Sequence, residues 1–380
     1  MSDNVYEAAL KRVRRIFDEF EHVVVSFSGG KDSTVILHLA LTVSKEMGRS
    51  PLPVLFIDQE AELTYTIDLM RRVMASPDVI PMWYQIPIRI ENAATVVGDQ
   101  YNHCWDKDHP EKWLREKEPF SIKENTYKHD VWEGLFKAVT AKDFSGKRVA
   151  FLAGVRAEEN PKRLTGLTET LTYKDITWGV TLNKGWHYTF YPIYDWIISD
   201  VWKCIHDNRL EYNEVYNVLF RLGEPIKEMR VSNVHHETAT KSLYRLQEVD
   251  PKLYEAMCVR MAGVDMAGKM REEAFNIKEL PSMFSSWEEY RDYLVTKLIA
   301  PELQKHYMDK FHALDEQYKL SAYKLEMYRY MIKTIVVGDH LFSNIATWER
   351  RPQVWMFRRW KKNPDNAKNT LPQYMRMIPT

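Results

Sequence analysis

The stretch that decides the fold is residues 23–33, VVVSFSGGKDS. Three consecutive β-branched residues indicate a buried strand. The two glycines that follow indicate a turn whose backbone amides can converge on an anion. A helical pattern runs from about residue 33 to 47, and the first amides and positive dipole end of such a helix would point at the same anion. The stretch therefore predicts a cradle for a phosphate or pyrophosphate.

This stretch differs from the common P-loop, because its glycines directly precede Lys31. Asp32 would repel an anion unless it caps the helix or holds a magnesium ion, and a plain strand–helix turn capped by Asp32 is the alternative interpretation. The candidate phosphate-binding residues here are Ser26, Ser28, Gly29, Gly30, Lys31, Asp32 and Ser33.

The first half of the chain alternates strand and helix signals around this stretch. Helical spacing covers residues 5–21 and 63–74, and apolar runs at 22–27, 53–57, 79–88 and 148–153 indicate buried strands. Residues 171–192 alternate about a turn at 183–185, which indicates a hairpin. Strands separated by helices imply right-handed crossovers. We therefore predict an α/β fold with a doubly wound, mostly parallel sheet.

The remaining regions suggest the domain organisation. Residues 89–146 are too long for a plain loop and hold Trp105, Trp113 and Trp132 among many charges, so we expect a helical insert beside the active-site edge. From residue 199 onward the pattern is almost entirely helical, with a weakly marked boundary between 222 and 234. We predict a nucleotide-binding α/β domain over residues 1–222 and a helical C-terminal region over 223–380.

Composition excludes several classes of protein. The 380 residues hold 53 Lys and Arg against 53 Asp and Glu, with 45% hydrophobic and 28% charged residues, which is unlike a disordered chain. The longest apolar stretches fall short of the ~18 residues that span a bilayer, and the start lacks a signal-peptide core. Three scattered cysteines favour a reducing compartment. These features predict a cytoplasmic protein that does not bind membranes.

Polar side chains follow two more of the predicted strands. Asp58 comes directly after the strand at 53–57, at the edge where open α/β sheets bind ligands, so we expect it to meet ribose, adenine or a metal. A turn-capping carboxylate is the alternative for Asp58. Arg156 and Arg163 follow the fourth strand together with Gly154 and Glu159, and their guanidinium groups suit a phosphate or sulfate. A surface ion pair is the alternative there.

These motifs resemble a known family. SGGKDS at 28–33 resembles the signature of the N-type ATP pyrophosphatases, or PP-loop proteins, which include phosphoadenylylsulfate (PAPS) reductases. Gly154, Arg156 and Glu159 match the Gly-x-Arg-x-x-Glu-Ser element of PAPS reductases, with Asn160 in the place of Ser. PIYDW at 192–196 followed by DVW at 200–202 matches a further element. The resemblance implies an adenine nucleotide-α-hydrolase-like fold and a ligand that is ATP or a PAPS/APS-like nucleotide.

A closer resemblance is to stand-alone PAPS reductase-like proteins typified by immunoglobulin-binding regulator A. It rests on DQEAE at 58–62, CWD at 104–106, Tyr212-Asn213 with Tyr216, and Met229-Arg230-Val231. Proteins of this branch often accompany a ParB/sulfiredoxin-like protein, so the resemblance implies such a partner.

Cysteine chemistry separates this chain from the reductases. The Glu-Cys-Gly-x-His segment that supplies their attacking thiol is absent, and Cys258 lies in a helical pattern where we expect it to be buried. PAPS reduction is therefore disfavoured. The chain has no Cys-x-x-Cys pair, so we expect neither an iron–sulfur cluster nor zinc. His103, Cys104 and His109, or His235 and His236, lack a convincing further metal ligand.

The C-terminal segment mixes cations with aromatic residues. It includes Trp348, Arg350, Arg351, Trp355, Phe357, Arg358, Arg359, Trp360, Lys361 and Lys362. Cations bind phosphate backbones and aromatic faces stack on bases, so the tail could bind nucleic acid. Alternatively, it docks its aromatic side chains on the protein core, or it closes over the nucleotide site.

Three functions fit these patterns. If the ligand is ATP, we expect attack on the α-phosphate and release of pyrophosphate, with Lys31 neutralising charge, Asp32 or Asp58 holding Mg²⁺, and Arg156 orienting the acceptor or sulfate end. The enzyme would then be of the nucleotidyl- or sulfur-transfer type. The alternatives are a nucleotide-sensing regulatory module without turnover and a nucleic-acid modification enzyme.

Overall fold

The fold is given by a computed structural model, which describes most of the chain. The described residues are 4–91, 101–159, 167, 171–183, 185–227, 229–231, 246–260, 279–319, 321–336, 339–340 and 342–362. They fall into two compact units. The first holds the described residues of 4–90, 101–231 and 246–260, and the second holds those of 279–362.

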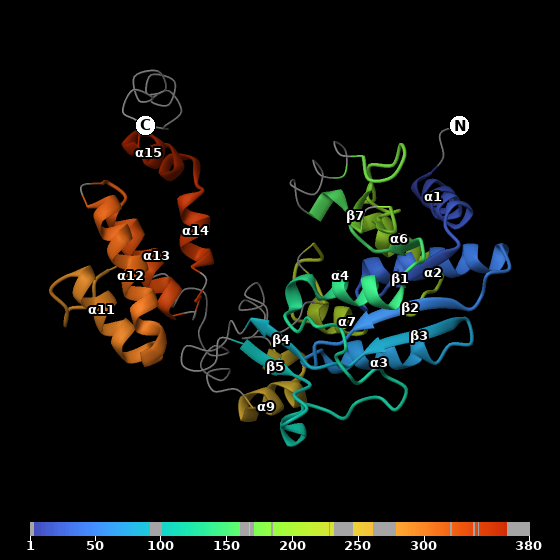
Figure 1. The fold of residues 1–380 in the computed structure, drawn as a ribbon, viewed down its shortest axis with the longest axis horizontal. Coiled ribbons are helices and arrows are strands. Elements are labelled where there is room, and N and C mark those ends of the chain that lie inside the picture. Colours follow the sequence, from blue (N-terminus) through green and yellow to red (C-terminus); the bar gives the residue numbers. More distant parts are fainter. Residues whose placement is uncertain are drawn as a thin grey trace. The chain divides into compact units, whose positions relative to one another are not determined.

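A six-stranded sheet forms the centre of the first unit (Figure 1). Its order is β3 (Val79–Tyr84), β2 (Leu52–Ile57), β1 (His22–Ser26), β6 (Val149–Leu152), β8 (His187–Phe190) and β7 (Gly179–Asn183). All neighbours are parallel except β7 and β8, which form an antiparallel hairpin. This arrangement confirms the predicted mostly parallel sheet. Since β1 is central, the loop that follows it emerges at the middle of the sheet edge.

The valine run of β1 is buried on both faces, which explains its unbroken apolar sequence. Val23 and Val25 join one hydrophobic cluster, to which four helices contribute, and Val24 joins another on the opposite face with Leu135 and Val139. The helices of the first cluster are α1 (Val5–Glu19), α2 (Lys31–Glu46), α3 (Thr64–Met74) and α6 (Ile198–Asp207); α4 (Trp132–Asp143) covers the other face.

The second helix, α2, begins two residues earlier than its sequence pattern predicts. Gly30 is its N-cap and has an extended backbone, and no side chain caps the helix. Asp32 lies in the first turn, where its carboxylate pairs with Arg156 at 2.5 Å. The alternative in which Asp32 caps the helix is therefore wrong, because an ion-pair partner at a neighbouring strand end holds the carboxylate instead.

The insert is only partly helical, which corrects the prediction of a helical insert. The third strand ends at Tyr84 because the chain leaves the sheet there, and the Gln85 amide donates to the Ile122 carbonyl at 2.9 Å. Pro87, which lacks an amide hydrogen, follows. The insert then contains a two-stranded sheet of β4 (Ile88–Glu91) and β5 (Tyr101–Cys104), a short 3₁₀ helix at Pro110–Lys112 and the helix α4.

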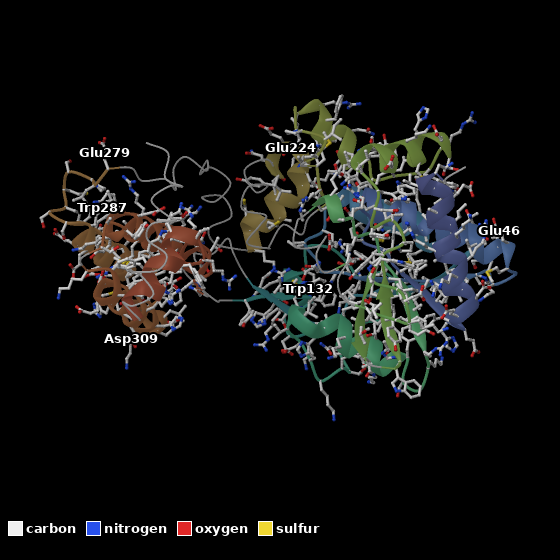
Figure 2. All side chains as sticks on the ribbon, turned by 90° about the horizontal axis from the view of Figure 1, so that it is seen from above. Glu46, Trp132, Glu224, Glu279, Trp287 and Asp309 are labelled. Atoms are coloured by element: carbon white, nitrogen blue, oxygen red, sulfur yellow. The ribbon has the colours of Figure 1, made fainter. Side chains whose placement is uncertain are left out.

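The second unit is helical, as predicted for the C-terminal region. It consists of α11 (Trp287–Leu298), α12 (Pro301–Tyr318), α13 (Lys324–Val336), α14 (Ser343–Glu349) and α15 (Pro352–Lys362). Figure 2 shows Trp287 at the start of α11 and Asp309 within α12. A buried cation, Arg291, pairs with Asp315 and lies 5.6 Å from the centre of the Tyr328 ring. No helix in the described part of the chain is long and apolar enough to cross a membrane.

The described part of the basic tail packs on its own unit. Trp348 is fully buried, and Phe357 stacks against Tyr318 with ring centres 5.6 Å apart. Arg351 and Arg358 both reach carboxylates of that unit, at Glu326 and Glu349 respectively. These contacts match the alternative in which the tail docks its aromatic side chains on the core, with arginines that are paired rather than only solvated.

Candidate functional site

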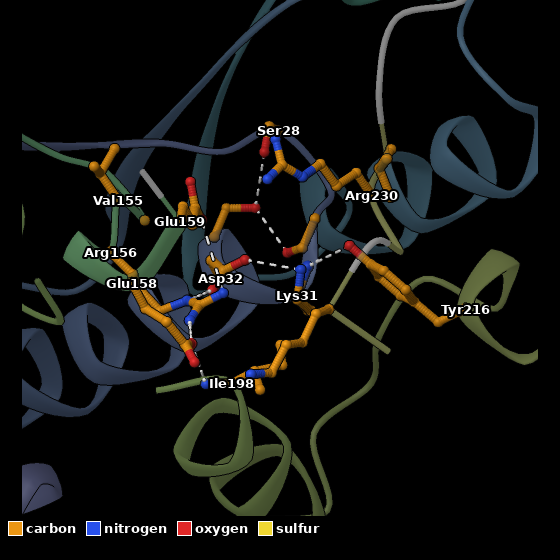
Figure 3. A pocket seen from close by; sticks show the side chains of 15 residues that line it. Ser28, Lys31, Asp32, Val155, Arg156, Glu158, Glu159, Ile198, Tyr216 and Arg230 are labelled. Atoms are coloured by element: carbon orange, nitrogen blue, oxygen red, sulfur yellow. Dashed lines mark hydrogen bonds and ion pairs between the residues drawn. The ribbon is translucent and has the colours of Figure 1, made fainter. Parts of the chain in front are cut away.

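A cavity of about 480 Å³ lies where the loops after β1 and β6 meet the start of α2 (Figure 3). Its lining residues come from these loops, from the start of α6, from α7 (Val215–Arg221) and from the segment that follows α7. They are Ser28, Gly30, Lys31, Asp32, Ser33, Gly154, Val155, Arg156, Glu158, Glu159, Ile198, Tyr216, Lys227, Arg230 and Val231. The cavity thus sits at the carboxyl ends of central parallel strands, where open α/β sheets bind ligands.

The glycine turn of the loop has a specific backbone geometry. Gly29 has a φ of +72°, which a residue with a Cβ rarely adopts. A Cβ at Gly29 would also lie 3.0 Å from the Thr66 side chain. Asn213 fixes the turn, because its side-chain amide donates to the Gly29 carbonyl at 3.2 Å and to the Thr66 hydroxyl at 2.9 Å. The turn is therefore held in place before any ligand arrives.

Gly154 lets the loop after β6 approach the helix start closely. A Cβ at this position would lie 2.6 Å from the backbone carbon of Asp32 and 2.7 Å from the backbone nitrogen of Ser33. Ordinary contacts begin at 3.4 Å, and backbone atoms in a helix cannot move aside cheaply. The glycine that matches the family element at position 154 thus has a steric basis.

Lys31 is buried and joins the loop to segments near residue 230. Its ammonium lies 3.2 Å from the Asp32 carboxylate and donates to the Met229 carbonyl at 3.2 Å. Its backbone amide donates to the Tyr216 hydroxyl at 3.0 Å, so a neutral hydroxyl meets one of the first amides of α2. Burial raises the pKa of Tyr216, which keeps this hydroxyl protonated.

Arg156 is the centre of an ion-pair network in the cavity wall. Its guanidinium donates to Asp32 at 2.5 Å and to Glu158 at 2.6 Å, and it lies 3.8 Å from Glu159. Burial alone would lower the pKa of Arg156, but the Asp32, Glu158 and Glu159 carboxylates together more than offset burial, so the pKa is raised. Glu158 also accepts the Ile198 amide at 2.8 Å, which ties α6 to this wall.

Asp58 matches its alternative as a turn-capping carboxylate, because it accepts the Glu60 amide at 2.8 Å, and it does not meet the expected ligand site. It is fully buried, does not line the cavity, and accepts hydrogen bonds from Trp83 at 2.8 Å, Gln85 at 3.0 Å and Arg115 at 2.5 Å. Its carboxylate therefore holds the insert to the strand ends. Asp32 and Asp58 do not line a common site, and both carboxylates are already bound by cations. These residues do not fit a magnesium ion, and we assign them none.

The two other carboxylates of the DQEAE motif are also buried, and Glu60 supports the insert. Glu60, with a φ of 67°, accepts the Leu114 amide at 2.8 Å and pairs with Arg260 at the end of α9 (Pro251–Arg260). Burial and the Asp58 charge raise the pKa of Glu62 to about 7. Arginines therefore neutralise two carboxylates of this buried cluster, whereas the raised pKa of Glu62 favours its protonated form.

The cysteines do not supply a reachable thiolate near the cavity. Cys104 and Cys204 are buried, and burial raises the pKa of the Cys104 thiol and raises the pKa of the Cys204 thiol to about 11. Cys258, expected to be buried, is only partly buried on α9. Among the described residues, no group of three or more His, Cys, Asp or Glu side chains converges as a metal site would require.

The cavity brings together most of the residues proposed from the sequence. Ser28, Gly30, Lys31, Asp32, Ser33, Gly154, Arg156 and Glu159 line it. Ser26 and Gly29 shape the loop without lining the cavity, and Arg163 lies outside the described residues.

Sequence reasoning missed Tyr216, Lys227 and Arg230 as site residues. Tyr216 and Arg230 fall in stretches that resemble the regulator A-like proteins, which was the available signal. Lys227 had none.

The sheet order, the glycine turn and the helix start that it feeds define an α/β protein of the adenine nucleotide α-hydrolase-like fold. Residues 22–223 match the phosphoadenosine phosphosulfate reductase domain, and the chain belongs to this family. Residues 223–377 match a second family, described as a domain of unknown function (DUF3440).

Individual relatives are similar over different lengths. The uncharacterized protein YbdN of Escherichia coli is 29% identical over 91% of this chain and 86% of its own length. Sulfate adenylyltransferase subunit 2 of Mycobacterium tuberculosis is 50% identical, but over only 13% of this chain and 16% of that protein. The crystal structure of PAPS reductase from Candida auris covers 60% of this chain and 89% of that one, with 17% identity and a TM-score of 0.35.

Proposed function

We propose that this protein binds the phosphate end of an adenine nucleotide, either ATP or an adenylyl sulfonucleotide such as PAPS or APS. The observation that carries the proposal is the cavity at the start of α2, where the glycine turn, Lys31 and the loop after β6 converge. A helix start with unpaired amides and a nearby ammonium attracts an anion. Membership of the PAPS reductase domain family supports an adenine nucleotide as the carrier of that anion.

The proposed roles of the loop residues follow from their contacts. The hydroxyls of Ser28 and Ser33 lie 3.2 Å apart on the cavity wall and would donate to phosphate oxygens. The Lys31 amide would exchange the Tyr216 hydroxyl for a charged oxygen, which is a stronger acceptor. The Lys31 ammonium would likewise exchange the Met229 carbonyl for the anion.

If the ligand is ATP, the proposed chemistry is transfer to an acceptor at the α-phosphate. The nucleophile of the acceptor forms a bond to the α-phosphorus, the bond to the bridging oxygen breaks, and its electron pair leaves with pyrophosphate. Lys31 would offset charge that develops on the leaving group, and Arg156 would orient the acceptor. No protein nucleophile is needed, which agrees with the buried thiols of Cys104 and Cys204.

If the ligand is PAPS, we propose binding without reduction. A reductase needs a thiolate that reaches the sulfur atom. Burial of two thiols, and the lack of a Glu-Cys-Gly-x-His segment in the sequence, argue against that step.

A second candidate is nucleotide sensing without turnover, and the contact between Lys31 and Met229 favours it. This bond joins the loop to a segment 198 residues away in the chain, so an anion that captures the Lys31 ammonium would break one of the contacts that hold that segment. Such a change could be transmitted to the ParB/sulfiredoxin-like protein that the resemblance to regulator A-like proteins implies. The contact supplies a link between ligand and partner binding.

Calorimetry and a pyrophosphate-release assay test these proposals. We expect ATP or PAPS to bind, and Lys31→Ala to weaken binding about tenfold or more while the variant still folds. Lys45→Ala, at the exposed far end of α2, is the matched control. Unchanged affinity in Lys31→Ala would count against the assigned site.

Release of pyrophosphate from ATP upon addition of an acceptor would support transfer, whereas nucleotide binding without release under any condition would support sensing. Addition of RNA or DNA tests whether the remaining alternative, nucleic-acid modification, contributes.

A further inference from the structure

The segment that follows α7 brings two cations to the cavity. Lys227 and Arg230 both line it, and both are exposed. Figure 3 shows the Arg230 side chain extending toward Ser28. Neither residue forms a hydrogen bond or ion pair with another residue in the part of the chain that the structure describes. We propose that Lys227 and Arg230 bind the polyanionic end of the nucleotide; this inference rests on the proposed function.

The charge balance of the cavity supports this assignment. The loops after β1 and β6 supply three carboxylates, of Asp32, Glu158 and Glu159, against the two cations Lys31 and Arg156. That wall has one negative charge in excess and would repel a pyrophosphate. Lys227 and Arg230 reverse the balance to one positive charge. The sign of the field that a nucleotide meets therefore depends on these two residues.

The cations of the loops are also less available than the two on the facing segment. Arg156 is buried and donates to Asp32 and Glu158, so turning its guanidinium fully to a ligand would take an ion-pair partner from the buried Asp32 carboxylate. Lys227 and Arg230 keep their donors in solvent. Binding an anion costs them little desolvation and breaks no existing ion pair among the described residues.

Neighbouring contacts keep the segment at the cavity. The Met229 carbonyl accepts the Lys31 ammonium, and the Tyr216 hydroxyl interacts with the Val231 backbone amide while it accepts the Lys31 amide. Met229 itself is buried. Arg230 thus lies between two anchored residues, and its guanidinium is presented to the cavity rather than to bulk solvent alone.

The same segment belongs to the part of the chain that matches the domain of unknown function. The helix α9, which lies in the same match, also belongs to the first unit. Asp250, directly before α9, accepts the Thr64 amide at 2.6 Å, and Arg260 at its end pairs with Glu60. We infer that the beginning of the match to the domain of unknown function, which carries Lys227 and Arg230, completes the cavity of the PAPS reductase domain. The match at 22–223 ends before these two cations.

The chemistry favours ligands with several charges. A triphosphate, a phosphosulfate or pyrophosphate can contact the loop amides and the facing cations together, whereas AMP presents one phosphate and adenosine none. Lys227 and Arg230 should therefore discriminate by anionic charge rather than by the base.

Calorimetry on the full-length protein tests this inference with ATP, PAPS, pyrophosphate and AMP. We expect the double variant Lys227→Gln/Arg230→Gln to bind ATP or PAPS, and pyrophosphate, about tenfold more weakly, with AMP changed less than about threefold. The salt dependence of ATP binding should also become shallower. Arg221→Gln, at the exposed end of α7 and outside the cavity lining, is the matched control.

Equal affinity in the double variant and the wild type would overturn the inference, and so would an equal loss for AMP and for the polyanions. Both outcomes would leave nucleotide binding itself intact. Failure of the wild type to bind any of the four ligands would instead overturn the proposed function, and this inference with it.

Discussion

Gly154 provides a direct test of how the cavity is assembled. In Gly154→Ala the new methyl group would meet the backbone of Asp32 and Ser33 at 2.6–2.7 Å. The two chain segments would have to separate by about 0.8 Å to reach ordinary contact. Overpacking of this kind costs about 1–3 kcal/mol. We place Gly154→Ala near the upper half of that range, because the opposing atoms are helical backbone.

The displacement would also affect binding, since it moves the peptide that carries Asp32 and the first turn of α2. The ion pair of Asp32 with Arg156 at 2.5 Å would lengthen, and the loop amides would no longer converge. We expect a fall of about 4–8 °C in the unfolding temperature, from a loss of about 2 kcal/mol. We also expect ATP affinity to fall by at least as much as in Lys31→Ala.

Gly48→Ala is the matched control, because it makes the same change just beyond the other end of α2. Gly48 has a φ of +65°, and no atom lies within 4 Å of the position that the new methyl group would take, so only backbone strain of about 1–2 kcal/mol applies. ATP affinity should not change in this control. If Gly154→Ala unfolded at the wild-type temperature and bound ATP equally well, the close approach of the two loops would be refuted.

Three further predictions concern stability. Glu62 has a folded-state pKa of about 7 against about 4.5 when unfolded, so the folded state binds the extra proton between these values, and the free energy of unfolding falls as pH rises from about 4.5 to 7. Glu62→Gln should remove up to ~3 kcal/mol of this fall, measured by urea unfolding at pH 5 and pH 8. The same fall in the variant and the wild type would contradict the prediction. Asp250→Ala removes caps from α3 and α9 and should lower the free energy of unfolding by about 2 kcal/mol in the same assay. Asn4→Ala, which removes the single cap of α1, should lower it by about 1 kcal/mol, and equal losses in the two variants would contradict the prediction. Arg291→Leu leaves Asp315 without its buried cation and should destabilise the second unit by about 3 kcal/mol without changing ATP affinity. A change in ATP affinity would contradict this prediction.

The strands and helices of the first unit were predictable because their apolar patterns are strong and regular. β1 and β2 match their predicted ranges within two residues, since both are buried on both faces. The insert was less predictable. One of its tryptophans, Trp105, is held by a distant residue, because its indole donates to the Asp58 carbonyl at 2.9 Å, and such a pairing leaves no periodic signal in the sequence.

The site was predictable where local geometry dictates the residue type. Gly29 and Gly154 are required by a backbone angle and by a close approach, and both stand beside a strand end. Asp58 was misplaced because a carboxylate after a strand fits a ligand and a structural anchor equally well. Lys227 could not be predicted as a site residue, because nothing in the sequence distinguishes an exposed lysine in a turn that lines a cavity from one that does not.

Asp250 has a consequence for the order in which the chain is made. Its carboxylate accepts the first amide of α3 from a position 186 residues further along the chain. A nascent chain that has already released the whole sheet from the ribosome still lacks this acceptor, and it also lacks the Met229 carbonyl that holds Lys31. The early part of the protein therefore lacks these two stabilising contacts until segments that are translated later have emerged.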